Sequence, residues 1–244
     1  KKRLIIFGYL GEKRKYVIVS NEGVPLQEIE ISDTDYAGVK TSPHSDLFVF
    51  YKAKEIFFST LEELKVTSSL KTSKTINTVA FSNDEKWIAI GYTDGSIQVA
   101  DVVTHKIIRD YSPHTNPISF LRFSANGKEL LSANGTGSIT HWDIDKKEPL
   151  NTWEPKERGE KINSFALFHP DGDMAVISRR IGNKTPRTLE ILNLRTGAIV
   201  GESSLPSLFD ANFSPDGSSF YAIPTDGKLR WWHFDETNPK VIGV

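Results

Sequence analysis

Histidine is the residue type in this sequence that could bind a metal ion or act as a general base, and no cysteine is present to assist it. The six histidines are widely separated: His44, His105, His114, His141, His169 and His233. No two of them have the i, i+2 or i, i+4 spacing that places two imidazoles on one face of a strand or helix. We therefore predict no metal site and no cofactor.

Serine nucleophiles and phosphate-binding loops are not indicated either. The sequence has no Gly-x-Ser-x-Gly elbow, and its Gly- and Ser-containing segments 135–138 and 216–219 are typical of hairpin turns. No Walker-type loop and no Gly-x-Gly-x-x-Gly loop leads from a strand into a helix. We predict no catalytic residue and a protein that is not an enzyme.

Aspartate could supply paired carboxylates for acid–base hydrolysis if the fold gathered several of them at one opening. Four aspartates stand in short segments that contain glycine: Asp94, Asp171, Asp216 and Asp226. Aspartate in such a segment closes a turn by hydrogen bonding to nearby backbone groups, and this is the interpretation we adopt. Asp33 and Asp35 fall in a predicted connection. Hydrolysis by gathered carboxylates stays open as an alternative.

A basic segment, residues 178–188, is the strongest indication of a binding role. Its four cations are Arg179, Arg180, Lys184 and Arg187, and it contains no acidic residue. We predict a loop, longer than the turns at the matching places elsewhere in the chain. Arginine binds carboxylate or phosphate through two parallel hydrogen bonds, so these four residues are candidates for partner binding. A solvated hairpin extension is the other interpretation.

Composition limits the class of protein. The chain has 244 residues, of which 38% are hydrophobic, and this is enough for a substantial core. A net charge of −1 argues against a dedicated nucleic-acid binder, and the lack of cysteine argues against a disulfide-stabilised scaffold. No apolar run approaches the roughly 20 residues of a membrane span. We expect an intracellular protein, cytoplasmic or nuclear, and the missing initiator methionine indicates a fragment or a processed chain.

One short pattern recurs along the chain and predicts its architecture. It consists of a hydrophobic pair, a serine or histidine, and a turn of the Pro-Asp-Gly kind. The residues at the same place in successive copies are Thr41, Phe81, Phe123, Phe168 and Phe213, with steps of 40, 42, 45 and 45 residues. A period of this length is typical of propeller blades. Phe123 and Phe213 are expected to be deeply buried.

Each period contains signals for four short strands and no helical stretch. The predicted strands of one period are 76–81, 87–91, 96–102 and 106–111, and those of the next are 118–123, 129–133, 138–144 and 150–153. The segment Thr93-Asp94-Gly95 marks a tight hairpin, because glycine adopts positive φ at little cost. A β-sandwich would share such strands but not the four-strand period.

These residues resemble the WD-repeat family. Gly137–Asp143 is similar to the closing motif of a WD repeat, and His114 and Ser132 stand where the family has a histidine and a serine. The resemblance implies that His114, Ser132, Trp142 and a turn aspartate form a hydrogen-bonded set. The aspartate position holds Thr136, so we expect an incomplete set here. Among the other repeats, one keeps Asp94 and the last keeps both Asp226 and Trp232.

The resemblance implies an all-β protein, a β-propeller of about six four-stranded blades in one domain. The expected blades are 1–35, 36–71, 76–114, 115–157, 162–205 and 208–244, and the first lacks its inner strand. Leu4–Tyr9 parallels Trp87–Tyr92, a second strand, so closure of the ring would place residues 4–31 beside 208–244. A seven-bladed ring with one blade truncated or disordered is the alternative. Trp142, Trp231 and Trp232 are expected in the core.

A WD-like ring without catalytic groups implies a non-catalytic scaffold for protein–protein interaction within a larger assembly. Two alternatives stay open. One is a propeller enzyme of the hydrolase or lactonase type with carboxylates at the central channel. The other is binding of RNA or a phosphopeptide through the basic segment, which is the one route to nucleic acid that we expect. Insertion into a membrane is not expected.

Overall fold

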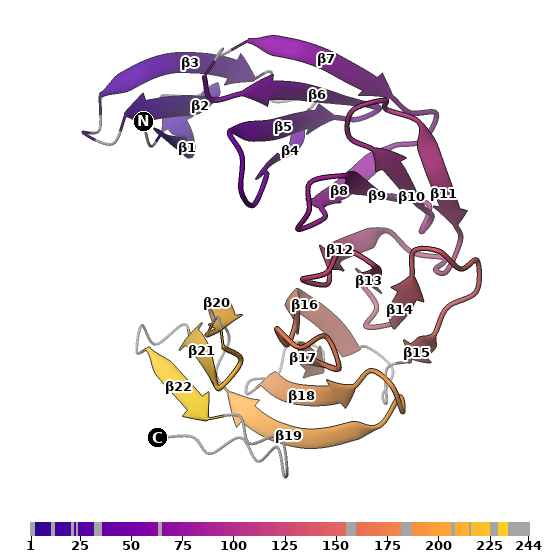
Figure 1. Cartoon of the computed structure of the whole chain (residues 1–244). Helices are drawn as coiled ribbons and strands as arrows, with labels where there is room; N and C mark the ends of the chain where they lie inside the picture. The colour runs from indigo at the N-terminus through magenta and orange to yellow at the C-terminus, as the bar shows by residue number, and fades with distance from the viewer. Residues whose placement is uncertain are drawn as a thin grey trace. The chain divides into compact units, whose positions relative to one another are not determined.

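The structure, a computed structural model, describes residues 3–10, 13–20, 22, 24–31, 36–62, 65–154, 160–181, 187–205, 208–214, 216–224 and 229–233. Within these residues every regular element is a β-strand, and the 22 strands form six antiparallel sheets (Figure 1). Strands that follow one another in the chain are neighbours in every sheet.

The sheets follow the order of the sequence. The first contains β1 (Arg3–Leu10), β2 (Lys13–Ser20) and β3 (Pro25–Ile31), and the second contains β4 (Tyr36–Thr41), β5 (Leu47–Lys52), β6 (Glu55–Thr60) and β7 (Val66–Lys71). The third contains β8 (Ile76–Phe81), β9 (Trp87–Tyr92), β10 (Ile97–Asp101) and β11 (Ile107–Tyr111), and the fourth contains β12 (Ile118–Phe123), β13 (Glu129–Asn134), β14 (Ile139–Asp143) and β15 (Asn151–Trp153). The fifth contains β16 (Glu160–Phe168), β17 (Met174–Ile181), β18 (Arg187–Asn193) and β19 (Ile199–Leu205), and the sixth contains β20 (Leu208–Phe213), β21 (Ser219–Pro224) and β22 (Arg230–His233).

Apolar runs and turn residues explain these elements. In β9 all residues after Trp87 are buried, as expected for a strand covered on both faces. The hairpin from β9 to β10 contains Gly95 at a φ of 87°, a left-handed conformation that favours glycine. A Cβ at Gly95 would also collide with the carbonyl oxygen of His114. The strand and the turn that follows it are thus both set by local sequence.

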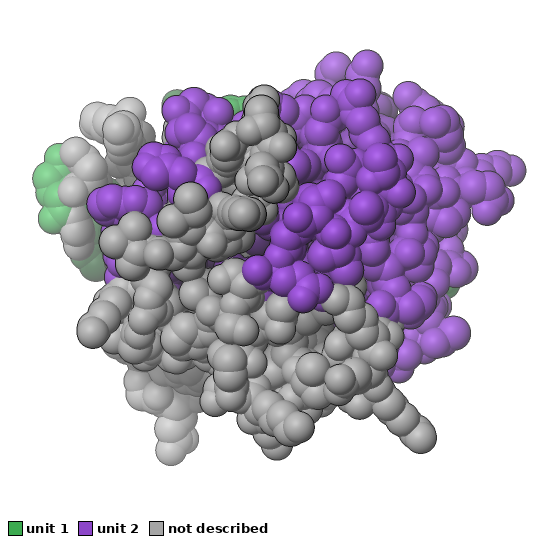
Figure 2. All heavy atoms as spheres, turned by 90° about the horizontal axis from the view of Figure 1, so that it is seen from below, with its two compact units in different colours: residues 1–77 green, residues 78–244 purple. Residues whose placement is uncertain are grey.

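The chain divides into two compact units, Lys1–Asn77 and Thr78–Val244, which are coloured separately in Figure 2. The described atoms in that view belong mostly to the second unit. The grouping of the whole chain into one domain, the blade limits given above and the number of blades stay predictions.

In the second unit, consecutive sheets pack on one another through apolar clusters. We call the interface between two consecutive sheets a seam. The seam between the third and fourth sheets buries Tyr111, Leu121, Phe123 and Trp142, and that between the fifth and sixth buries Leu167, Ile191, Phe213 and Phe220. Phe123 and Phe213 are therefore buried, as predicted. The first strands β12 and β16 contact one another, and the fourth strands β11, β15 and β19 lie on the outside (Figure 1).

Hydrogen bonds from the outer strand reinforce the seam between the third and fourth sheets. Arg109 Nε in β11 donates to the carbonyl oxygen of Ile144 at 2.6 Å, and the Tyr111 hydroxyl donates to the same oxygen at 3.3 Å. Burial raises the pKa of Tyr111 to about 12, so its hydroxyl remains a donor at neutral pH.

The next seam repeats this arrangement with different side chains. Asn151 Nδ2 in β15 donates to the carbonyl oxygen of Leu194 at 2.7 Å, and Trp153 Nε1 donates to that of Gly197 at 2.8 Å. Strand register makes Asn151 equivalent to Arg109, because each pairs with the residue two before the end of its third strand. The bond to the following sheet is kept although the donor residue changes.

Residues 178–181 and 187–188 of the basic segment lie in strands and not in the loop that the sequence predicted. Arg179 and Arg180 lie in β17, paired with Ile162 and Lys161 of β16, and Arg187 is the first residue of β18. The prediction was wrong for these residues because their backbone groups continue the ladder between the strands. Lys184 lies outside the described residues.

Trp231 also departs from its prediction, because half of its surface is exposed. It pairs with Tyr221 of β21, whereas Phe220, the residue before Tyr221, packs into the cluster against the fifth sheet. Side chains alternate between the two faces of a strand, so Trp231 and Tyr221 point to the opposite face. No described sheet of the same unit covers that face, and the core prediction for Trp231 was wrong.

Candidate functional site

His114 stands at the centre of a buried hydrogen-bond network in the fourth sheet. Its Nε2 lies 3.2 Å from Ser132 Oγ, which also accepts a hydrogen bond from Trp142 Nε1 at 3.0 Å. The Ser132 hydroxyl donates to the carbonyl oxygen of Thr140 at 3.4 Å. The three side chains named for this set from the sequence are therefore in contact.

The place that the sequence left empty in this network is filled by Asn134. Asn134 Nδ2 lies 3.4 Å from His114 Nδ1, and its Oδ1 accepts hydrogen bonds from Thr136 N and Ser138 N, which closes the turn. The set is thus not incomplete, because an amide two residues before Thr136 reaches the same imidazole. The donors around the ring assign the neutral Nε2–H tautomer to His114.

The remaining structural candidates serve turns or lie outside the described part. Asp94 accepts hydrogen bonds from the backbone N and hydroxyl of Ser96, as expected for a turn aspartate. Asp226 is outside the described residues, and of Trp232 only the backbone is described. The side chains of Arg179, Arg180 and Arg187 are likewise not described, so their role in partner binding stays a prediction.

The described carboxylates considered for hydrolysis also belong to turns. Asp216 accepts hydrogen bonds from the Ser214 and Ser218 hydroxyls, and these bonds hold the pKa of Asp216 below its usual value. Asp171 follows the buried His169 in the equivalent hairpin. Asp33 and Asp35 are outside the described residues. The described part of the chain has no cluster of three or more His, Asp or Glu side chains that could hold a metal ion.

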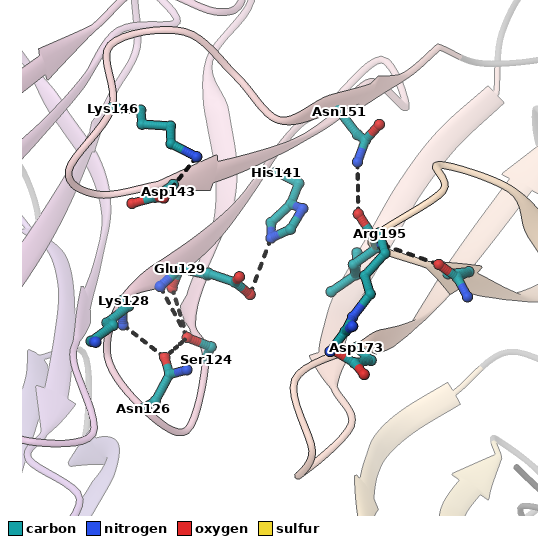
Figure 3. Close-up of polar contacts among 12 residues, drawn as sticks. Ser124, Asn126, Lys128, Glu129, His141, Asp143, Lys146, Asn151, Asp173 and Arg195 are labelled. Atoms are coloured by element: carbon teal, nitrogen blue, oxygen red, sulfur yellow. Dashed lines mark hydrogen bonds and ion pairs between the residues drawn. The ribbon is translucent and has the colours of Figure 1, made fainter.

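A cleft of about 460 Å³ opens at the seam between the fourth and fifth sheets, and we call it the Glu129 cleft. Its lining residues are Glu129, His141, Leu150, Asn151, Gly172, Asp173, Leu194 and Arg195. Figure 3 shows Glu129 and His141 of the fourth sheet pointing toward one another, with Asp173 and Arg195 on the facing sheet. It is the candidate functional site.

His141 is the unusual residue of this cleft. Only 2% of it is exposed, and neither of its ring nitrogens has a hydrogen-bond partner. Nε2 lies 3.2 Å from Glu129 Oε2, within ion-pair distance, but makes no hydrogen bond to it. The ring makes an edge contact with Phe168. Burial of a polar ring without hydrogen bonds costs free energy, so this position is not explained by packing.

The opposite wall of the cleft carries a closed ion pair. Arg195 Nε donates to Asp173 Oδ1 at 2.8 Å, so these two charges neutralise one another. The Glu129 side chain faces the cleft with 29% of its surface exposed. The described lining therefore has one carboxylate, that of Glu129, with no lysine or arginine paired to it.

Sequence reasoning missed Asn134, Glu129 and His141. Asn134 was overlooked because an acid was sought at position 136. His141 belongs to the closing motif in the sequence, but Val99 and Ile191 occupy the equivalent place in the neighbouring sheets. A polar residue at a repeat position that is otherwise apolar was the available signal.

Comparison with known proteins gives matches to a WD40 domain model and to complex subunits. The model of the anaphase-promoting complex subunit 4 WD40 domain matches residues 39–126. The chain is 29% identical over 170 residues to the retinoblastoma-binding protein homolog 5 of Caenorhabditis elegans, covering 68% of this chain and 36% of that protein. It is 24% identical to the target of rapamycin complex subunit wat1 of Schizosaccharomyces pombe, covering 62% of this chain and 45% of that one. These matches support a WD-repeat family for this chain.

The fold of the chain is a β-propeller. A chain in the crystal structure of the mitotic checkpoint complex superposes with a TM-score of 0.81, covering 99% of this chain and 73% of that chain, at 14% identity. At that identity the likeness concerns the fold alone. The matched part of this chain spans 36% and 45% of the lengths of the two curated relatives named above. Within the residues that the structure describes, no helix has the length and hydrophobicity to span a bilayer.

Proposed function

We propose that this WD-repeat protein is a non-catalytic scaffold that holds partner proteins within a larger assembly. The observation that supports the proposal most is the repeated sheet architecture, which it shares with chains named as complex subunits. In such an architecture the strands and seams provide the stability, so turns and outer edges are free to vary and to bind.

Arg179, Arg180, Lys184 and Arg187 are the proposed docking residues for an acidic protein surface. Two of them are neighbours in β17, and Arg179 pairs with Thr188 beside Arg187. Arginines held on paired strands lose less conformational freedom on binding than arginines in a loop, which favours their use at an interface.

Crosslinking and affinity purification from the native cell test this function. We expect partner proteins in fixed stoichiometry that comigrate with the chain in size-exclusion chromatography after nuclease treatment. The triple variant Arg179→Ala, Arg180→Ala, Arg187→Ala should lose at least one of them while its melting temperature stays close to that of the wild type. The matched control replaces three exposed lysines, Lys54, Lys71 and Lys106, and should lose none.

The outcomes separate the alternatives. A chain that migrates alone would contradict the scaffold proposal, and unchanged partners in the triple variant would contradict the docking residues. Partners that disappear after nuclease treatment, with affinity that falls steeply with salt, would instead indicate RNA binding through this segment.

A further inference from the structure

The Glu129 cleft exists because side chains that fill the preceding seam are absent here. Strand register makes Glu129 equivalent to Trp87 of the third sheet, since each pairs with the last residue of its third strand. Trp87 packs against the apolar cluster of its seam, and Arg109 spans that seam to reach Ile144. Glu129 and the shorter Asn151 leave this volume open.

The hairpin turn beside the cleft also lacks a contact that the equivalent turns make at other seams. A Cβ added at Gly127 would lie 3.2 Å from Asp84 Oδ1, and one at Gly217 would collide with the His169 ring, so these hairpins touch the hairpin of the preceding sheet. Gly172, at the same place in the fifth sheet, has no such atom within 4 Å. Among these three seams, only here does the hairpin glycine have no atom of the preceding hairpin beside it.

Polar groups replace the missing apolar ones. His141 is buried without a hydrogen bond at the place of Val99 and Ile191, which are buried apolar residues. Among the described residues, no lysine or arginine pairs with the Glu129 carboxylate, and Asn151 donates through Nδ2 to the facing sheet and leaves Oδ1 as an acceptor. A departure from the repeat that leaves polar groups unsatisfied marks a functional position rather than a structural one.

We propose that the Glu129 cleft binds a basic side chain, lysine or arginine, presented by a protein partner. The cationic head group donates to the Glu129 carboxylate and to Asn151 Oδ1, while the buried His141 ring lies behind the Glu129 carboxylate. The aliphatic stem lies against Leu150, which is partly exposed, and Leu194. This inference deepens the proposed scaffold function by naming what one docking site would recognise.

Small probes test the cleft apart from any cellular partner, so failure here is distinct from failure of the scaffold proposal. The probes are the acetylated methylamides of arginine, lysine, citrulline and glutamate, titrated into the isotopically labelled chain. The readout is the NMR shift of the Gly172 and Leu194 amides. The arginine or the lysine probe should bind saturably and at least tenfold more tightly than citrulline, which has a similar shape without the charge. The tighter of the two identifies the head group.

Variants locate the binding group. Glu129→Gln, which keeps shape and removes charge, should weaken the bound basic probe at least tenfold, whereas the matched change Glu22→Gln at an exposed glutamate of the other unit should not. Glu129→Lys should reverse the preference toward the glutamate probe, and circular dichroism of each variant checks that it folds. Equal binding of citrulline and arginine, or unchanged affinity in Glu129→Gln, would overturn the proposal. Binding of the glutamate probe by the wild type at these amides would overturn it too, by assigning the cleft to an anion at Arg195.

Discussion

Burial sets the protonation state of His114, because desolvation lowers its pKa from 6.5 to about 4. The neutral ring donates through Nε2–H to Ser132 and accepts at Nδ1 from Asn134. In the unfolded chain the same imidazole binds a proton near pH 6.5. The network therefore contributes stability that is fully present above pH 6.5 and is lost as the pH falls through 4.

Lowering the pH from 7.5 to 4.5 should thus reduce the free energy of unfolding through this one group. A separation of the folded and unfolded pKa values by two to three units corresponds to roughly 2–3 kcal/mol over that range. The measurement is urea denaturation at a series of pH values for the wild type and for His114→Gln, whose side chain does not titrate. The variant should be less stable at neutral pH and should lose less stability on acidification.

Asn134→Asp provides the matched control for this prediction. A carboxylate beside Nδ1 favours the protonated ring, so the folded pKa of His114 should rise in an NMR titration and the loss of stability in acid should shrink. Parallel pH profiles for the wild type and His114→Gln would show that burial of His114 does not set the pH dependence.

At the scale of elements, the sequence predicted strands where turn residues mark their ends. The predicted strands of the third and fourth sheets agree with the observed ones to within two residues, because Asp94 and the glycine-containing turns interrupt the ladder there. The same reasoning failed at residues 178–181 and 187–188. Glycine, proline and four cations indicated a loop, but Arg179 and Thr188 pair across lengthened strands, and composition does not reveal such pairing.

The Glu129 cleft could be predicted only in part. The polar residue His141 among apolar repeat positions was visible in the sequence. The open volume was not, because it depends on how two sheets pack and on the absence of a contact at Gly172. A cleft at a seam depends on two sheets together, so the hydrophobic pattern of either sheet alone does not predict it.

The hairpin glycines allow the contact between elements to be measured. Gly217 and Gly172 have similar positive φ angles, 73° and 84°, so alanine should introduce comparable backbone strain of about 1 kcal/mol at each. Only at Gly217 would the new methyl group meet the buried His169 ring. Gly217→Ala should therefore destabilise the protein by roughly 1–3 kcal/mol more than Gly172→Ala in chemical denaturation. Equal losses would indicate that the neighbouring hairpin gives way.

At the scale of the whole molecule, closure of the propeller is the main structural prediction. The first and last sheets each have three described strands, and the prediction places residues 4–31 beside 208–244. Closure would bury sheet edges that otherwise offer unpaired backbone groups to other chains.

The absence of cysteine makes this prediction accessible to pairwise distance measurement. Spin labels on cysteines introduced at the exposed residues Glu22 and Ser218 should lie closer together than labels at Glu22 and Glu148, because in a closed ring of six the first blade neighbours the sixth and is opposite the fourth. Double electron–electron resonance measures both pairs. The reverse order of distances would contradict closure between the ends of the chain.

The bonds across the seams have a consequence for how such a protein can change over evolutionary time. Their acceptors are main-chain carbonyl oxygens, of Ile144 in one seam and Leu194 in the next, and every residue type supplies a carbonyl. The donor can therefore drift from arginine to asparagine without a compensating mutation in the facing sheet. Each seam can diverge independently of the others, so one of them can lose its filling side chains and gain polar ones while the rest keep the fold.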